Sequence, residues 1–589
     1  MKSFFKYVLA TVTGGVVLFV LLLLVLAGVI ASAVSSMESD KEVQVPKSAV
    51  LYVSLDYAIP ERSSTNPLES VSLPGYGERK SIGLNDIRSR IKAAKEDDRI
   101  KGIYLNPRVV NVGMASLREI RDALVDFKSS GKFIVAYADM LTQKAYYIAS
   151  VADEIYLNPE GSLEFKGLSA SVTFMKEALD KLGVEVQVIK VGTYKSAVEP
   201  FILNQMSPAN REQVSAYIAD LYQAFLENVS QGRDIPVDSL RNIADQYLIR
   251  TPEDAQAYKF VDGLCYKDEV LAKLKERLAV ENKKEVPSVS LLDYQAAEKA
   301  TERKGGRVAV LYAYGDIVDG EGDEGSIGGD KLSRDLRKLR QDDRVKAVVL
   351  RVNSPGGSAL ASDVIAREVA LTKAVKPVVV SMGDYAASGG YYISALADSI
   401  FAEKETLTGS IGVFGLIPNF KDLLNNKLGI RSDVVKTGKF ADLMTSFDKP
   451  LTAEETAIIQ ADVNRVYATF TQKVASGRGM QVSAVDSIGQ GRVWTGAQAL
   501  ERGLVDGIGG LDRAIQAAVN KAGLEEYHVR YYPTEKDPFM ALFSTSKEQI
   551  KAWMLDDELA EYRQHIERLR NLVQAAGIQV RMPYAVEIR

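Results

Sequence analysis

The chain has 589 residues and a net charge of -4, with ordinary fractions of hydrophobic (46%) and charged (25%) side chains. This length allows two or more domains, and the charge excludes the overall basic character of proteins that chiefly bind nucleic acid. The single cysteine, Cys265, excludes an intrachain disulfide and a zinc site built from several cysteines.

The first residues predict a membrane anchor. Residues 1–6 carry two lysines, and the stretch 7–36 has no charged side chain. That stretch exceeds the ~20 apolar residues that cross a bilayer. We expect one uncleaved transmembrane helix, although small residues at its end leave cleavage possible. The short positive flank is expected to stay in the cytoplasm, and the body outside it, next to the membrane.

The body of the chain repeats itself. Five segments of the first half recur in the second half in the same order, which indicates a duplicated domain. The pairs are 100–106 with 345–351, 145–159 with 390–404, 179–195 with 425–441, 221–233 with 466–478, and 251–264 with 495–508.

The repeats set the predicted domain boundaries, which are 46–280 for the first repeat, 281–306 for a polar linker, 307–525 for the second repeat and 526–589 for a strand-helix extension. In each repeat short β-branched runs, such as AVVLRV, PVVVSMG and DVVKTG in the second, alternate with amphipathic segments. This alternation predicts an α/β fold with largely parallel strands and crossover helices.

Two candidate site motifs occur only in the second repeat. Ser410 lies in TLTGSIGVFG between two glycines, which allow a sharp turn and close approach of a substrate. In RVNSPGGS, the backbone N–H groups of Gly356 and Gly357 follow a predicted buried strand and could bind an oxyanion. Alone, either motif is also an ordinary turn.

A candidate base occurs only in the first repeat. Lys195 lies in VGTYKSAVEPF, and its counterpart in the second repeat is Ala441. Burial among apolar and small residues would favour the neutral amine, which can accept the proton of a serine. The two histidines, His528 in a predicted strand and His565 in a predicted helix, are poor candidates for that base. The sequence therefore predicts a dyad of Ser410 and Lys195, split between the repeats.

A second serine competes with Ser410 as the nucleophile. Ser388 lies in DYAASGGYY, which resembles the serine turn of the Clp proteases, whose architecture is crotonase-like. Those enzymes need a histidine further along the chain, and this region has none. For this reason the sequence favours Ser410.

Taken together, RVNSPGGS, AASGGYYIS, LTGSIGVFG and VGTYKSAVEPF resemble the signal peptide peptidase A (protease IV) family in its long, duplicated form. The resemblance implies tandem Clp-protease-like domains and a serine endopeptidase anchored in the bacterial inner membrane, with its body in the periplasm. It implies Ser410 as the nucleophile, Lys195 as the base and Gly356 and Gly357 as the oxyanion hole, with no metal or cofactor. It also implies a homotetramer that degrades signal peptides left in the membrane.

Other functions stay open. The peptidase could act more broadly in the quality control of membrane proteins. A crotonase-like fold also carries acyl-CoA chemistry, although an exported body has little access to coenzyme A. A non-catalytic, membrane-tethered scaffold is the third class, and its function would survive Ser410→Ala.

Overall fold

The computed structural model describes residues 6–7, 13–21, 28, 45–63, 81–281, 284–294, 305–323, 325–445, 447–534, 577–582 and 587–588. The predicted anchor over 7–36 lies largely outside these residues, as do His565 and the predicted helix around it. Within the described ranges, none of the helices combines the length and apolar character needed to cross a membrane.

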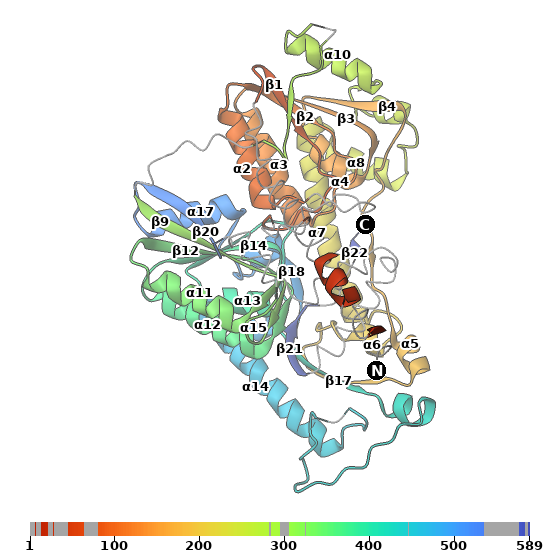
Figure 1. Cartoon of the computed structure of the whole chain (residues 1–589), viewed down its shortest axis with the longest axis vertical. Coiled ribbons are helices and arrows are strands. Elements are labelled where there is room, and N and C mark those ends of the chain that lie inside the picture. The colour runs from red at the N-terminus through yellow and green to blue at the C-terminus, as the bar shows by residue number, and fades with distance from the viewer. Residues whose placement is uncertain are drawn as a thin grey trace.

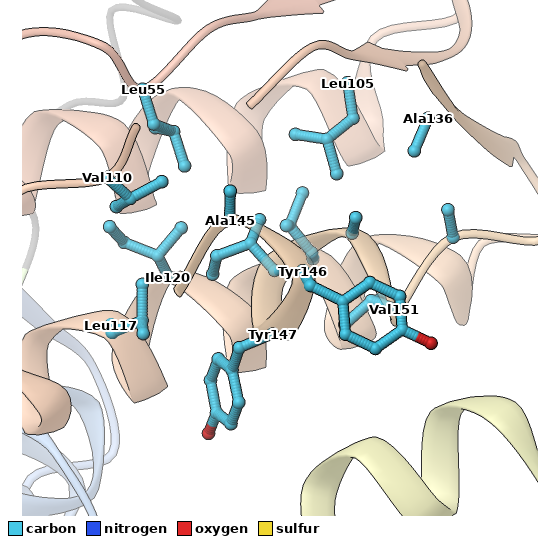
Figure 2. Packing of buried hydrophobic residues seen from close by; sticks show 14 of the residues in the cluster. Leu55, Leu105, Val110, Leu117, Ile120, Ala136, Ala145, Tyr146, Tyr147 and Val151 are labelled. Carbon is cyan, nitrogen blue, oxygen red and sulfur yellow. The ribbon is translucent and has the colours of Figure 1, made fainter. Parts of the chain in front are cut away.

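The first repeat is built on a parallel sheet with the strand order β7-β4-β3-β2-β1-β8. Its strands are buried apolar runs, as expected where helices cover a parallel sheet. Figure 2 shows part of this core, where side chains of β2, β3 and α3 pack around α4. The bounds are β1 (Ala49–Val53), β2 (Ile100–Leu105), β3 (Phe133–Leu141), β4 (Glu154–Leu163), β7 (Gly263–Leu264), β8 (Ser288–Ser290), α2 (Leu84–Glu96), α3 (Met114–Lys128) and α4 (Gln143–Ala149).

The second repeat has the same plan, with the strand order β18-β16-β14-β12-β9-β20 and with β15 and β19 joined to β14. Among these ladders only β16 with β18 is antiparallel. The bounds are β9 (Gly306–Tyr314), β12 (Val345–Ser354), β14 (Val378–Ala387), β15 (Ser399–Ala402), β16 (Leu407–Gly409), β18 (Val493–Thr495), β19 (Gly507–Ile508), β20 (Tyr527–Tyr532), α11 (Gly329–Gln341), α12 (Ala359–Lys373), α13 (Gly389–Ser394) and α17 (Leu511–Lys521). The predicted α/β class is confirmed.

Two segments have a structure different from the one that the sequence predicts. The segment predicted as a linker contains β8, which pairs with β1 and so completes the first sheet. The predicted strand DVVKTG (433–438) is not a strand, and the side chain of Val435 is 97% exposed. By the repeat alignment, 431–437 is the counterpart of β6 (Glu185–Val191). That strand pairs with β17 (Val413–Asn419), whereas 431–437 has no strand partner within the described ranges.

A third sheet joins the two repeats. Its order is β11-β10-β13-β21-β17-β6, and β6 is the only member from the first repeat. β6 runs antiparallel to β17, from Glu185 opposite Asn419 to Val191 opposite Val413. Because Ser410 lies just before β17, this ladder brings the end of β6 next to Ser410. Figure 1 shows β17 and β21 of this sheet side by side. The bounds of its other strands are β10 (Asp316–Val318), β11 (Ser326–Gly328), β13 (Gly356–Ser358) and β21 (Gly577–Arg581).

Candidate active site

Lys195 is carried from the first repeat into the second by the end of β6. The chain turns at Gly192, whose φ of +109° favours glycine, and the Tyr194 N–H donates to the Gln490 carbonyl at 2.8 Å. Two further glycines make room for the lysine. A β-carbon built on Gly491 would lie 2.6 Å from Lys195 Cβ, and one on Gly412 would lie 3.1 Å from Lys195 Cδ. The lysine therefore enters a slot that glycines of the second repeat leave open.

The amine of Lys195 meets both candidate serines. Its Nζ lies 2.7 Å from Ser388 Oγ, 3.1 Å from Ser410 Oγ and 3.0 Å from the Ser410 carbonyl oxygen. All three side chains are fully buried. Burial lowers the pKa of Lys195 well below its usual range, and no neighbouring charge contributes to the shift. Burial thus favours the neutral amine over the ammonium form.

The contacts of the lysine amine allow an arrangement in which the two serines have different roles. A neutral amine has two N–H donors and one lone pair. The carbonyl and hydroxyl oxygens of Ser410 can accept both donors, and the Ser410 hydroxyl can donate to the Gly491 carbonyl at 3.3 Å. The lone pair then remains for the hydroxyl proton of Ser388. In this arrangement Ser410 orients the lysine, and Ser388 is the hydroxyl that the lysine can deprotonate.

Ser388 also has the backbone of an activated nucleophile. It forms the sharp turn between β14 and α13, with φ 55° and ψ -110°, a strained conformation for a residue with a side chain. The Ser388 N–H donates a hydrogen bond to the Gly409 carbonyl at 2.8 Å. The next residue, Gly389, is the first of α13, where backbone N–H groups have no partner within the helix. Such amides favour a developing negative charge.

The predicted oxyanion turn lies at Ser388. A β-carbon built on Gly356 would lie 2.7 Å from the Gly389 nitrogen, so the backbones of these two glycines are in contact. Gly357 instead packs on β10, since its β-carbon would lie 2.0 Å from the Ile317 carbonyl oxygen. The geometry thus brings Gly356, rather than Gly357, to Gly389, and the Gly356 N–H donates to Ser354 Oγ at 3.1 Å. It also argues for Ser388 over Ser410 as the nucleophile.

Gln213, a buried residue of α7 (Pro208–Arg233), was not predicted from the sequence as part of the site. Its Nε2 donates to the Tyr194 carbonyl at 3.0 Å and to Ser196 Oγ at 2.8 Å. Its Oε1 accepts from the Val493 N–H of the second repeat at 3.1 Å. Gln213 therefore ties the lysine turn to the other repeat. A buried glutamine on a long helix carries no sequence signal for such a role.

Comparisons with known proteins agree with the duplicated architecture. The family described as Peptidase family S49 matches residues 126–281 and again 370–525. A protein named Protease 4 from Salmonella typhi is 38% identical over 84% of this chain and 81% of its own length. A chloroplastic serine protease SPPA from Arabidopsis thaliana is 35% identical over 82% of this chain and 70% of its own length. A solved ClpP1 mutant from Listeria monocytogenes covers 35% of this chain and 94% of its own, at 15% identity and a TM-score of 0.24.

Proposed function

The chain belongs to peptidase family S49 and is a serine protease, and from this premise we propose that it is a membrane-anchored endopeptidase with a Ser-Lys dyad. Lys195 is the base, Ser388 is the nucleophile, and the amides of Gly356 and Gly389 form the oxyanion hole. One observation carries the dyad: a fully buried lysine amine, with a pKa lowered by burial alone, lies 2.7 Å from a strained serine of the other repeat.

The reaction is acyl transfer. Neutral Lys195 takes the hydroxyl proton of Ser388 while Ser388 Oγ forms a bond to the carbonyl carbon of the peptide. The carbonyl π electrons move to its oxygen, where the two glycine amides stabilise the negative charge. As the tetrahedral intermediate collapses, the C–N bond breaks and the lysine ammonium protonates the leaving nitrogen. Water then hydrolyses the acyl-enzyme by the same steps, and Lys195 again serves as the base.

The substrate, location and assembly belong to the same proposal. Residues 7–36 anchor the chain in the inner membrane, with the body on the periplasmic side, and the substrates are signal peptides left there after export. The uncharged N-terminal stretch supports the anchor. The body assembles as a homotetramer, which the exposed apolar side chains of Val434 and Val435 support because their counterparts in β6, Val188 and Ile189, pair with another repeat.

Hydrolysis of a synthetic signal peptide by the full chain in detergent micelles tests the proposal. We expect cleavage within the apolar segment by the native chain. Lys195→Ala and Ser388→Ala should be inactive while they keep the native thermal transition. Cleavage that persists in either variant would remove the dyad from the mechanism.

A further inference from the structure

The C-terminal segment of the chain lies beside the proposed nucleophile. Strand β21 (Gly577–Arg581) is antiparallel both to β13 and to β17, so it fills the space between them; Figure 1 shows it next to β17. β13 begins with Gly356 of the oxyanion turn, and β17 begins just after Ser410. A peptide presented to Ser388 in extended form would add to these same two strand edges. β21 therefore occupies the position that a substrate strand needs.

The backbone of this segment contacts the glycines of the proposed oxyanion hole. The Val580 carbonyl oxygen would lie 2.2 Å from a β-carbon built on Gly356 and 3.1 Å from one built on Gly389. The Met582 N–H donates to the Pro355 carbonyl at 2.7 Å. With β21 in place, the side chains of Ser388 and Lys195 have 0% exposure. A substrate cannot reach them in this arrangement.

The side chains of the segment also resemble an apolar substrate. Apolar Ile578, Val580 and Met582 alternate with polar Gln579 and Arg581, as in a strand with one buried face. Val580 is fully buried, and Met582 lines a cavity of about 590 Å³. Leu407, Val493 and Pro355 are among the other residues of this cavity. On the polar face, Arg581 forms an ion pair with Asp316 at 2.7 Å.

We propose that Gly577–Met582 is an intramolecular occupant of the peptide-binding groove, which competes with peptide substrates and withdraws when they bind. The proposal rests on the proposed function, since it assumes that peptides enter this groove. Each ladder of this strand is short, since β21 has three residue pairs with β13 and three with β17.

A reversible disulfide tests the proposal in the full chain. Ser358 and Gln579 are direct partners across the β13–β21 ladder, within reach of a disulfide between antiparallel strands. We would combine Ser358→Cys and Gln579→Cys, with each single variant as a control. The probe is a fluorescein-labelled peptide, GIQVRM, whose binding is measured by anisotropy in a Ser388→Ala background. We expect oxidation to weaken binding at least about ten-fold, and reduction to restore it. Equal affinity of the oxidised and reduced forms would overturn the proposal.

A second variant releases the segment. Val580→Asp introduces a charge at a fully buried position of β21, so it should expel the strand and strengthen probe binding about ten-fold. Gln579→Glu, at a half-buried position of the same strand, is the matched control and should leave binding unchanged. If Val580→Asp lowers the melting temperature without strengthening binding, β21 is a permanent part of the sheet and the proposal fails.

Hydrolysis of an apolar reporter peptide by the double-cysteine chain with Ser388 intact separates the two proposals. Probe binding that responds to the disulfide, in a chain that cleaves no peptide when reduced, would support the occupant and contradict the proteolysis. Cleavage that continues unchanged in the oxidised chain would support the proteolysis and contradict the occupant.

Discussion

The two repeats share a framework but not a chemistry. Tyr146 in the first repeat donates its hydroxyl proton to the Phe260 carbonyl at 3.1 Å, and Tyr391 in the second donates to the Leu504 carbonyl at 2.9 Å. With these tyrosines aligned, Ser388 falls opposite Gln143. The Gln143 amide donates to the Gly167 carbonyl at 2.8 Å and accepts from the Gly167 N–H at 3.0 Å.

This comparison shows how a duplicated fold can hold a single site. The first repeat has an amide where the second has a strained serine, and it supplies the lysine that the second lacks. With the proposed dyad, neither repeat would catalyse the reaction alone, and the contact between them would be part of the active site.

The largest effect is expected at Lys195, the contribution of the first repeat. Lys195→Ala should lower kcat/KM for a signal peptide by about 10³-fold, because the base is lost. Lys190→Ala is the matched control, since Lys190 lies on the same strand and has Lys436 as its counterpart; it should retain activity. Equal losses in both variants would point to damage to β6 rather than to loss of a base.

The two serines should respond differently. Ser388→Ala should abolish hydrolysis, whereas Ser410→Ala should lower kcat about 10- to 100-fold, because the lysine loses one of its acceptors and is less well oriented. Steady-state kinetics on both variants distinguishes them. The reverse order of effects would restore Ser410 as the nucleophile.

The pH dependence of kcat/KM should report the protonation of Lys195. Because burial lowers the pKa of Lys195 and only the neutral amine is a base, kcat/KM should rise with pH through that lowered pKa and then level off. Below it, activity should fall about ten-fold per pH unit. A profile that is flat from mildly acidic to alkaline pH would contradict Lys195 as the base.

A smaller effect is expected at Gln213, which links the repeats. Gln213→Ala removes hydrogen bonds to the lysine turn and to Val493, so kcat should fall about ten-fold and the free energy of unfolding by about 1–3 kcal/mol. Gln231→Ala, at an exposed position of the same helix, should change neither by a comparable amount. Wild-type kcat in Gln213→Ala would show that the lysine turn holds its position without this link.

The smallest effects are expected in the shared framework. Tyr146→Phe and Tyr391→Phe each remove one buried hydrogen bond, which should lower the free energy of unfolding by about 1 kcal/mol. Calorimetry should find similar losses for the two variants, with activity retained. A much larger loss of unfolding free energy in one variant would show that this hydrogen bond does not stabilise the two repeats equally.

The sequence predicts the framework well because repetition and periodicity are local signals. The buried strands β2 and β12 fall where IKGIYLN and VKAVVLR predict them, and the α/β class follows from their alternation with helices. Lys195 and Ser410 could be found because the repeats differ at those positions, and Ser388 because DYAASGGYY resembles the serine turn of the Clp proteases. Packing between segments that are distant in the sequence is not encoded by a local pattern. The choice between Ser388 and Ser410 depends on where the Gly356 turn packs. Segment 431–437 forms no strand because, among the described residues, nothing pairs with it as β17 pairs with β6.

The most direct test of a site shared between the repeats is covalent labelling of the full chain by a fluorophosphonate, followed by peptide mass spectrometry. The oxygen of an activated serine displaces fluoride from the fluorophosphonate, so a phosphonyl group stays on that oxygen. A site shared between the repeats predicts one adduct on Ser388 in the native chain and none in Lys195→Ala. An adduct on Ser410, or labelling of Ser388 that is unchanged without Lys195, would contradict it.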